Sequence, residues 1–284
     1  MIVKLKQILA KLAELMRPKL GYRFPRLGRI ANNLFFKLMP TGIETELFPQ
    51  IRITLDLTDS TQQTTYWQGS RFEKPTPQVL AEWGKKATVF FDIGANYGFY
   101  SYWMVSRCPH LFIHAFEPNR KNYDILRSTK KINDLYQLHP YLLGLSNKKE
   151  SIPLHIAKDD SGHSTFGNHP LLTDSPTTQV QLMPFDVWVD EQNMSRPDSP
   201  SWIAKIDVEG FEPGVLQGME QSLMSKAFIG LIVEINPYTL KFCNAEPEDI
   251  FRVLNKSGYK IAKQSPIHRE NYNAESGNAF FIPK

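Results

Sequence analysis

From residue 87 onward, short apolar segments alternate with amphipathic helical segments, and this alternation constrains the fold more than any other feature. The expected strands are the apolar runs at 87–92, 111–116, 136–143, 202–207 and 228–235, with shorter candidates at 259–262 and 279–282. Continuous apolar strands separated by helices indicate a mostly parallel sheet covered on both faces. The sequence therefore predicts an α/β fold with a doubly wound, Rossmann-like sheet.

Carboxylates follow four of these expected strands. Asp92, Glu117, Asp207 and Glu234 stand at or near the carboxyl ends, where ligands bind in sheets of this kind. An acidic crevice suits a cationic ligand better than a phosphate. A cofactor site is therefore expected at these strand ends.

The turn after the first strand reads Asp92-Ile93-Gly94-Ala95-Asn96-Tyr97-Gly98. Gly94 allows a sharp turn, and Gly98 allows the next helix to pack close to the strand. A dinucleotide site would carry glycine at the middle position, where Asn96 crowds a pyrophosphate. S-adenosylmethionine has no phosphate and carries an ammonium and a sulfonium, so the pattern favours it over a dinucleotide.

Glu117 supports this interpretation. It ends the second expected strand, 19 residues after Gly98, close to the interval at which an acidic residue meets a ribose diol. A carboxylate there can accept hydrogen bonds from both hydroxyl groups.

Several segments together resemble the FkbM-type S-adenosylmethionine-dependent methyltransferases. The blocks that carry the resemblance are VFFDIGANYGFYS (89–101), HAFEPNRKNYDIL (114–126), LGLSN (143–147) and IAKIDVEGFEPGVLQG (203–218), with weaker matches at 231–237 and 278–283. It runs from about residue 66 to the end, and it does not extend to residues 1–60.

The resemblance implies a class I methyltransferase fold, a mostly parallel seven-stranded sheet with an antiparallel last strand. It also implies that the cofactor is contacted by Asp92, Gly94, Asn96, Gly98 and Glu117. Ser146, in the loop after the third strand, would lie near the adenine, although a plain turn serine is an equally simple interpretation.

Methyl transfer to oxygen requires an aligned nucleophile and removal of its proton. Lys205 and Asp207 share one face of the fourth strand, and Glu209 follows in the turn. Asp207 would orient the sulfonium side of the cofactor or accept the proton, and Lys205 would hold a carboxylate or lower a hydroxyl pKa. The alternative is a buried ion pair that only shapes the turn. His163 is a second candidate base.

Asp207, Glu209, Glu234 and Asn236 carry oxygen atoms of the kind that bind magnesium. Their spacing is not diagnostic, and we expect no metal.

The basic pI belongs to the N-terminus. Residues 1–40 hold nine Lys or Arg and one acidic residue, a net +8, whereas the remaining 244 residues carry −4. Apolar residues recur at helical spacing from Leu5 to Met16, which predicts a basic amphipathic helical arm. The arm would contact a partner subunit, its own domain or an anionic membrane surface. We expect three parts: this arm (1–40), a lead-in region (41–86) and the methyltransferase domain (87–284).

The resemblance favours O-methylation of a sugar, a glycan or glycolipid, or a secondary metabolite, with selectivity in the polar insertion 155–178. One alternative is a nucleic-acid methyltransferase, because Asn236-Pro237-Tyr238 is similar to a signature of such enzymes. The acidic body argues against a nucleic-acid partner. The other alternative is an inactive cofactor-binding or scaffolding subunit. Two cysteines and the lack of an 18-residue apolar run predict a cytoplasmic location, with possible peripheral membrane contact.

Overall fold

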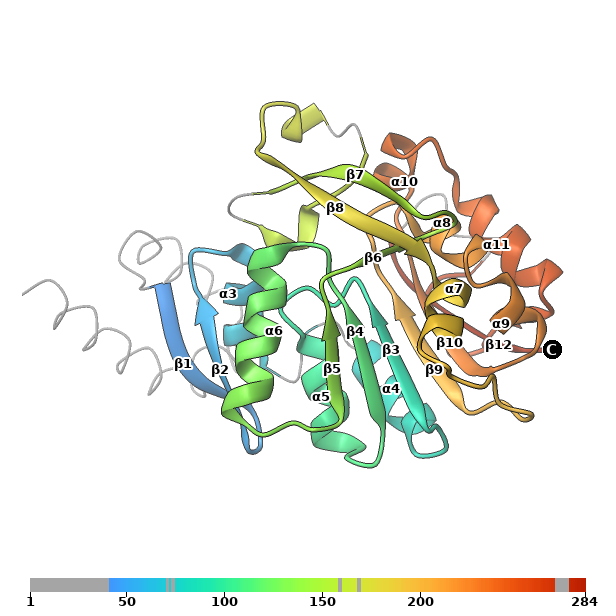
Figure 1. Ribbon diagram of the computed structural model, residues 1–284, viewed down its shortest axis with the longest axis horizontal. Helices are drawn as coiled ribbons and strands as arrows, with labels where there is room; N and C mark the ends of the chain where they lie inside the picture. Colours follow the sequence, from blue (N-terminus) through green and yellow to red (C-terminus); the bar gives the residue numbers. More distant parts are fainter. Residues whose placement is uncertain (1–40, 70–71, 73–74, 158–159, 168–169, 269–275) are drawn as a thin grey trace, which may run out of the picture.

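The centre of the computed structural model is a seven-stranded sheet, and residues 41–69, 72, 75–157, 160–167, 170–268 and 276–284 are described. Its strands are β3 (Val89–Ile93), β4 (Phe112–Phe116), β5 (Leu138–Tyr141), β9 (Trp202–Ile206), β10 (Phe228–Ile235), β11 (Tyr259–Ile261) and β12 (Gly277–Pro283). Their order is β11-β12-β10-β9-β3-β4-β5 (Figure 1). The run from β10 to β5 is parallel, and β12 is antiparallel to both neighbours. The predicted sheet, with its antiparallel last strand, is confirmed.

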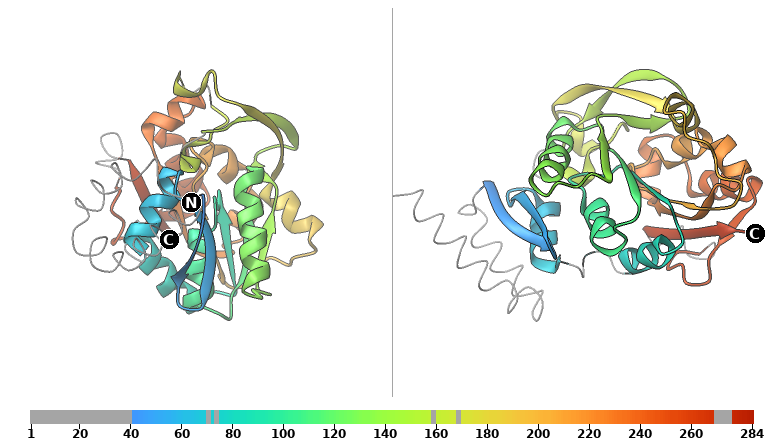
Figure 2. Two further views of the ribbon diagram at one scale, coloured as in Figure 1. Left: turned by 90° about the vertical axis from the view of Figure 1, so that its left-hand side faces the viewer. Right: turned by 60° about the horizontal axis from the view of Figure 1, so that its bottom comes forward.

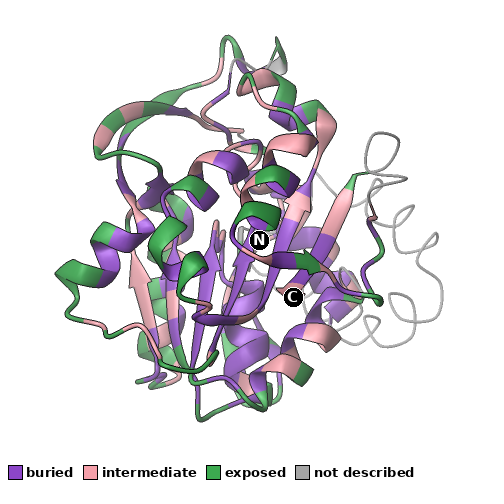
Figure 3. Ribbon diagram, turned by 90° about the vertical axis from the view of Figure 1, so that its right-hand side faces the viewer, coloured by how far each residue is buried: buried purple, intermediate pink, exposed green. Residues whose placement is uncertain are grey.

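Successive residues of the central strands enter opposite cores, because side chains alternate across a sheet. Phe90 belongs to one apolar cluster and Phe91 to the other. The first cluster also receives α4 (Thr76–Gly84), α5 (Phe99–Arg107) and α6 (Arg120–Ile132). The second receives α7 (Phe185–Glu191), α8 (Glu212–Gln217), α9 (Glu220–Met224) and α11 (Pro247–Lys256). Figure 3 shows the resulting buried strands at the centre of the molecule.

The lead-in region begins with an antiparallel hairpin of β1 (Thr41–Phe48) and β2 (Ile51–Asp56), followed by α3 (Ser60–Gln68). The alternation of apolar and polar residues in β2 is typical of a half-buried strand. β2 lies beside α6 (Figure 1). Ile53 and Leu55 join the same apolar cluster as Phe90, so the hairpin shares a core with the central sheet.

Residues 144–184, which include the polar insertion 155–178, form a small sheet over one end of the central one (Figures 1 and 2). Its strands are β6 (Gly144–Ser146), β7 (Glu150–His155) and β8 (Thr177–Pro184), in the order β6-β8-β7. Two short 3₁₀ turns, η3 (Ser161–His163) and η4 (Pro170–Leu172), connect β7 to β8. This arrangement brings η3 toward the strand ends.

The segment that follows Pro213 is not one continuous helix, since the structure divides it into α8 and α9. The break lies at Gly218, where an added Cβ would be 2.0 Å from the carbonyl oxygen of Ser146. The chain therefore leaves α8 where it passes against β6.

In the described part of the chain, no helix is both long and apolar enough to cross a membrane. The predicted arm, residues 1–40, lies outside the described residues.

Candidate active site

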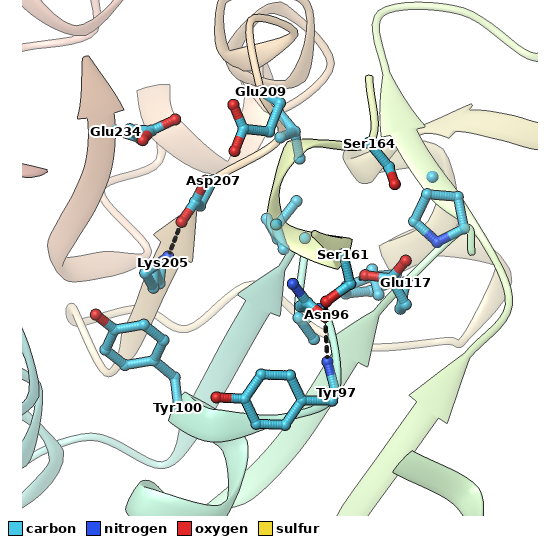
Figure 4. Close-up of a pocket in the computed structure, with 18 of the residues that line it drawn as sticks. Asn96, Tyr97, Tyr100, Glu117, Ser161, Ser164, Lys205, Asp207, Glu209 and Glu234 are labelled. Carbon is cyan, nitrogen blue, oxygen red and sulfur yellow. Dashed lines mark hydrogen bonds and ion pairs between the residues drawn. The ribbon is translucent and has the colours of Figure 1, made fainter. Parts of the chain in front are cut away.

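A pocket of about 270 Å³ lies at the carboxyl ends of the central strands, beneath the insertion (Figure 4). Nine of the residues proposed from sequence line it: Gly94, Asn96, Glu117, His163, Lys205, Asp207, Glu209, Glu234 and Asn236. The other three, Asp92, Gly98 and Ser146, are not part of its wall. The pocket therefore joins the expected cofactor turn to the expected catalytic strand, 111 residues apart between Asn96 and Asp207.

Glu117 is fixed at one end of the pocket by two backbone amides. Its Oε2 accepts a hydrogen bond from the amide of Asn96, and its Oε1 accepts one from Asn119, both at 2.7 Å. The residue is 6% exposed, and this burial raises the pKa of its carboxyl to about 7, although the two amides act to lower it. The side chain of Asn122 is a third hydrogen-bond donor to this carboxylate. A carboxylate has about four lone-pair sites, so Glu117 can still accept from one further donor.

Asp92 and Gly98 lie behind the pocket wall and contact the neighbouring helices. The Asp92 carboxylate accepts a 2.6 Å hydrogen bond from Ser101 in α5, and burial raises its pKa to about 6. Gly98 has a φ of 102°, and a Cβ there would be 2.5 Å from Leu126 of α6. These two residues join the turn to its helices, and direct cofactor contact by them stays a prediction.

Ser146 is buried behind the wall as well. Its hydroxyl donates to Oδ1 of Asn147 at 3.4 Å, while Gly144 and Leu145 beside it line the pocket. Proximity of Ser146 to an adenine stays a prediction.

Lys205 and Asp207 form an ion pair at the other end of the pocket. Nζ of Lys205 donates to Oδ2 of Asp207 at 2.5 Å, and the lysine side chain is only 3% exposed. The ammonium also lies 4.5 Å from the centre of the Tyr100 ring, a favourable cation–π distance. Sequence reasoning missed Tyr100, which lies two residues after Gly98 at the end of the glycine turn. The ion pair is present, as both the catalytic interpretation and the structural one required. Both side chains line the pocket, and a catalytic role stays a prediction.

Glu209 and Glu234 face Asp207 across a small gap (Figure 4). One carboxylate oxygen of each of the three residues lies within 4.8 Å of the others. Burial, followed by the charge of Asp207, raises the pKa of Glu209 to about 9 and that of Glu234 well above its usual value. The raised pKa values favour protonated carboxyls on Glu209 and Glu234, which reduces their repulsion with Asp207. The absence of a metal at these three residues stays a prediction.

The turn after β9 is held by Glu212, a residue that sequence reasoning did not single out. Its carboxylate accepts hydrogen bonds from the amides of Val208 at 2.8 Å and Gly210 at 3.1 Å. Glu212 is 1% exposed. An acidic residue directly before Pro213 at a helix start is the signal that could have identified it.

Asn236 lines the pocket but also begins α10 (Pro237–Phe242). Its side-chain oxygen accepts from the amides of Tyr238 at 3.1 Å and Thr239 at 3.5 Å. Helix capping therefore explains the Asn-Pro pair without a role in nucleic-acid methylation.

The insertion lines one side of the pocket through η3. Ser161 donates from its hydroxyl to Oδ1 of Asn96 at 3.0 Å and from its amide to Asp59 at 2.8 Å. Thr61 and Phe72 of the lead-in region line the same pocket. No local sequence signal identified these lead-in residues, since they reach the site only through tertiary packing.

Fold and site together define a class of protein. The sheet is seven-stranded and doubly wound, and its last strand is antiparallel. A glycine turn follows its first strand and an acidic residue follows its second. These are the features of a class I methyltransferase. The chain belongs to the methyltransferase FkbM domain family, whose sequence pattern matches residues 92–261.

Two relatives are 27% and 23% identical to the chain over their aligned segments. Hexuronic acid methyltransferase AglP of Haloferax volcanii is 27% identical over 187 residues, which cover 66% of this chain and 70% of that protein. Methyltransferase 1 of Beauveria bassiana is 23% identical over 192 residues, covering 62% and 73%. Among solved structures, an O-methyltransferase from Bacillus cereus in complex with SAH aligns with a TM-score of 0.39 and 11% identity, covering 74% of this chain and 82% of that one.

The cofactor of this family, and of this protein, is S-adenosylmethionine. The residues present fit it. The remaining acceptor site of Glu117 suits a ribose hydroxyl, and Leu143 and Leu145 give that end of the pocket an apolar wall. The carboxylates at the other end suit a cationic group.

Proposed function

We propose that the protein is an O-methyltransferase that acts on a hydroxyl group of a sugar, a glycan or glycolipid, or a secondary metabolite. One observation carries the proposal: a single pocket holds Glu117 at one end and the Lys205–Asp207 pair at the other. Membership of a methyltransferase family supports transfer of a methyl group. The hexuronic acid methyltransferase among its relatives supports a sugar acceptor.

The polar end of the pocket also favours a hydroxyl-rich acceptor. Asp207, Glu209 and Glu234 present oxygens from neighbouring strand ends, and sugar hydroxyls can donate to carboxylates and accept from protonated carboxyls. The insertion supplies the wall above them, with Ser164 and Phe166. Selectivity among acceptors would reside in this wall.

S-adenosylmethionine, when bound, supplies a methyl group that its sulfonium has already activated. The protein must hold the acceptor in line with that methyl and exclude water. In this proposal Glu117 holds the ribose end, and Asp207 presents a negative charge at the transfer end. Lys205 orients Asp207 through their ion pair, and the ammonium and its aromatic neighbour Tyr100 are both buried. Glu209 contributes a hydrogen-bonding carboxyl.

The test is a transfer assay with S-adenosylmethionine labelled in its methyl group. Purified protein is incubated with glycan, glycolipid, small-molecule and nucleic-acid fractions of host extract, and the labelled product is identified by mass spectrometry. We expect an alkali-stable methyl ether in a glycan, glycolipid or small-molecule fraction. Asp207→Asn serves as the negative control, and Asp190→Asn, a surface variant at the far end of α7, serves as the positive control.

Three results would contradict the proposal. Label in nucleic acid would favour the base-methylating alternative, and an alkali-labile methyl ester would show that the acceptor is a carboxylate. A protein that fails to bind S-adenosylmethionine would be a scaffolding subunit.

We also propose a cytoplasmic setting and a contact role for residues 1–40. The two cysteines, Cys108 and Cys243, are free thiols, which suits a reducing compartment. The positive charge of the arm supports contact with an acidic surface, which can be the body of its own chain, a partner subunit or an anionic membrane.

A further inference from the structure

His163 is the one histidine among the described residues that line the pocket, and the structure gives it a partner that the sequence could not show. Its Nδ1 lies 3.0 Å from Oδ2 of Asp160. The other oxygen of Asp160 accepts a 2.8 Å hydrogen bond from the hydroxyl of Thr61, in α3. Both oxygens of Asp160 are therefore engaged, and its orientation is fixed.

The turn that carries His163 is pressed against α3. The amide of His163 donates to the carbonyl of Asp160 at 3.1 Å. Gly162 permits the contact, because a Cβ there would be 2.8 Å from Oγ1 of Thr61. The turn is also tied to the cofactor loop through Ser161 and Asn96. The imidazole is thus positioned by two elements about 100 residues apart.

This geometry selects one tautomer. Asp160 takes the hydrogen of Nδ1, so neutral His163 carries its lone pair on Nε2. Within the described residues Nε2 has no hydrogen-bond partner. The side chain is 65% exposed, so an acceptor in the pocket mouth can reach it. An aspartate that orients a histidine toward a nucleophile is the arrangement that general-base catalysis uses.

Asp207 is less suited to receive a proton. Its carboxylate is held at 2.5 Å by the buried ammonium of Lys205, and protonation would leave that ammonium without a charged partner. Burial and the charge of Asp207 raise the pKa of Glu209 to about 9 and that of Glu234 well above its usual value, which favours their protonated forms. His163 differs in that its side chain is 65% exposed and its Nε2 is in no ion pair among the described residues, although it too becomes a base only as the pH approaches about 9.

We propose that His163 is the general base of methyl transfer and that Asp160, held by Thr61, is its positioning residue. This inference rests on the proposed O-methyl transfer. As the acceptor oxygen bonds to the methyl carbon, the carbon–sulfur bond breaks and its electron pair returns to sulfur, which becomes a neutral thioether. The proton of the acceptor hydroxyl moves to Nε2 of His163 and then to solvent.

The charges around His163 give the base a defined pH response. The hydrogen bond to Asp160 raises the pKa of His163 to about 9, with further contributions from the charges of Asp160, Glu209 and Asp207. Burial alone would raise the pKa of Asp160, but hydrogen bonds from His163, Ser60 and Thr61 lower it to about 2. The base form of His163 therefore increases as pH rises toward about 9, while Asp160 stays ionised.

The experiment measures kcat/KM of the full-length protein against pH, with the acceptor found in the transfer screen. The wild type should gain activity up to about pH 9. His163→Gln should lose about 100-fold or more at the alkaline plateau, a typical general-base contribution. Its dissociation constant for S-adenosylmethionine should stay within about twofold, because substitution of His163 changes no contact of the Glu117 end. His139→Gln, in β5 and outside the pocket wall, is the matched control with unchanged activity.

Asp160→Asn separates positioning from folding. Loss of the carboxylate lowers the pKa of His163, so the rising limb of the profile should move to lower pH and the plateau should fall. The titration of the His163 ring by NMR should show the same downward shift without any acceptor present. A purely structural Asp160 would leave the limb in place.

His163→Gln with near wild-type kcat/KM, or an Asp160→Asn profile whose limb does not move, would overturn the inference while leaving the transferase function intact. A wild-type protein that methylates no hydroxyl would instead remove the proposed function, and this inference with it.

Discussion

Gly94 and Asp207 are in backbone contact: a Cβ added to Gly94 would lie 1.8 Å from the carbonyl oxygen of Asp207. The amide of Asp207 also donates to the carbonyl of Ile93 at 3.0 Å. The glycine turn after β3 and the carboxyl end of β9 are therefore joined through their backbones. This contact sets the position of the Lys205–Asp207 pair relative to the turn.

Gly94→Ala should disrupt this backbone contact. The φ of Gly94 is 79°, so alanine would add backbone strain to the overlap with Asp207. Together these should cost about 3 kcal/mol or more of folding free energy. Denaturant titration measures the loss, and calorimetry with S-adenosylmethionine measures the accompanying loss of binding. Gly214→Ala is the control, since its nearest neighbouring atom would be 3.8 Å away; equal stability of the two variants would contradict the argument.

Glu117→Ala should weaken S-adenosylmethionine binding by about one to two decades. A charge-assisted hydrogen bond to the ribose contributes roughly 1.5–3 kcal/mol. The substitution also frees the amides of Asn96 and Asn119, which Glu117 holds in place. Calorimetric titration gives the dissociation constant, with Glu220→Ala as a surface control. Unchanged affinity would remove Glu117 from the cofactor site.

The stability of the ligand-free protein should fall as pH rises from about 5 to 9. Burial raises the pKa of Glu117 and Glu212 to about 7 and that of Glu209 to about 9. Between the ordinary glutamate pKa and these values, the folded state binds more protons than the unfolded state, so raising the pH favours unfolding. His163, with its raised pKa, acts in the same direction between about 6.5 and 9.

Urea denaturation at a series of pH values checks this prediction. Glu212→Gln removes one of the titrating groups, so its stability should decline less steeply between pH 5 and 7. A stability that rises with pH across this window would show that these carboxyls are not buried as protonated groups.

Asp207→Asn should abolish most methyl transfer while the protein stays folded. Asparagine keeps the shape and can still accept a hydrogen bond from Lys205, but it presents no negative charge to the transfer site. Single-turnover assays measure transfer, and circular dichroism with cofactor titration verifies the fold. Turnover near the wild-type level would exclude Asp207 from the reaction.

The parts of this site that could be predicted from sequence are local ones. Asp92 to Gly98 form one turn, and Lys205 and Asp207 share a strand face because side chains alternate with a period of two. Glu117 was predictable from its position after the next strand. In each case a few consecutive residues determine the geometry.

The rest depends on packing between distant segments. Thr61 and Asp160 are 99 residues apart and meet only because α3 lies against the irregular turn η3. Neither segment has a periodic pattern that fixes its neighbour. Likewise, Asp92 was expected at the cofactor, but the sequence could not show that Ser101 in α5 would take its carboxylate.

Deleting residues 1–40 should leave cofactor binding intact, because all the motif positions and all the described residues that line the pocket lie beyond them. The deletion removes a net charge of +8 and the apolar positions from Leu5 to Met16. We expect the arm to contact protein, since apolar helical stripes pack most often against other protein surfaces. The truncated chain should therefore show a lower thermal midpoint or a changed oligomeric state, measured by calorimetry and light scattering, with no dependence on lipid.

A membrane role predicts a different result: attraction of about 1 kcal/mol per basic residue near anionic lipid, weakened by salt. Salt-sensitive sedimentation of the full chain with anionic vesicles, lost on truncation, would establish that role instead.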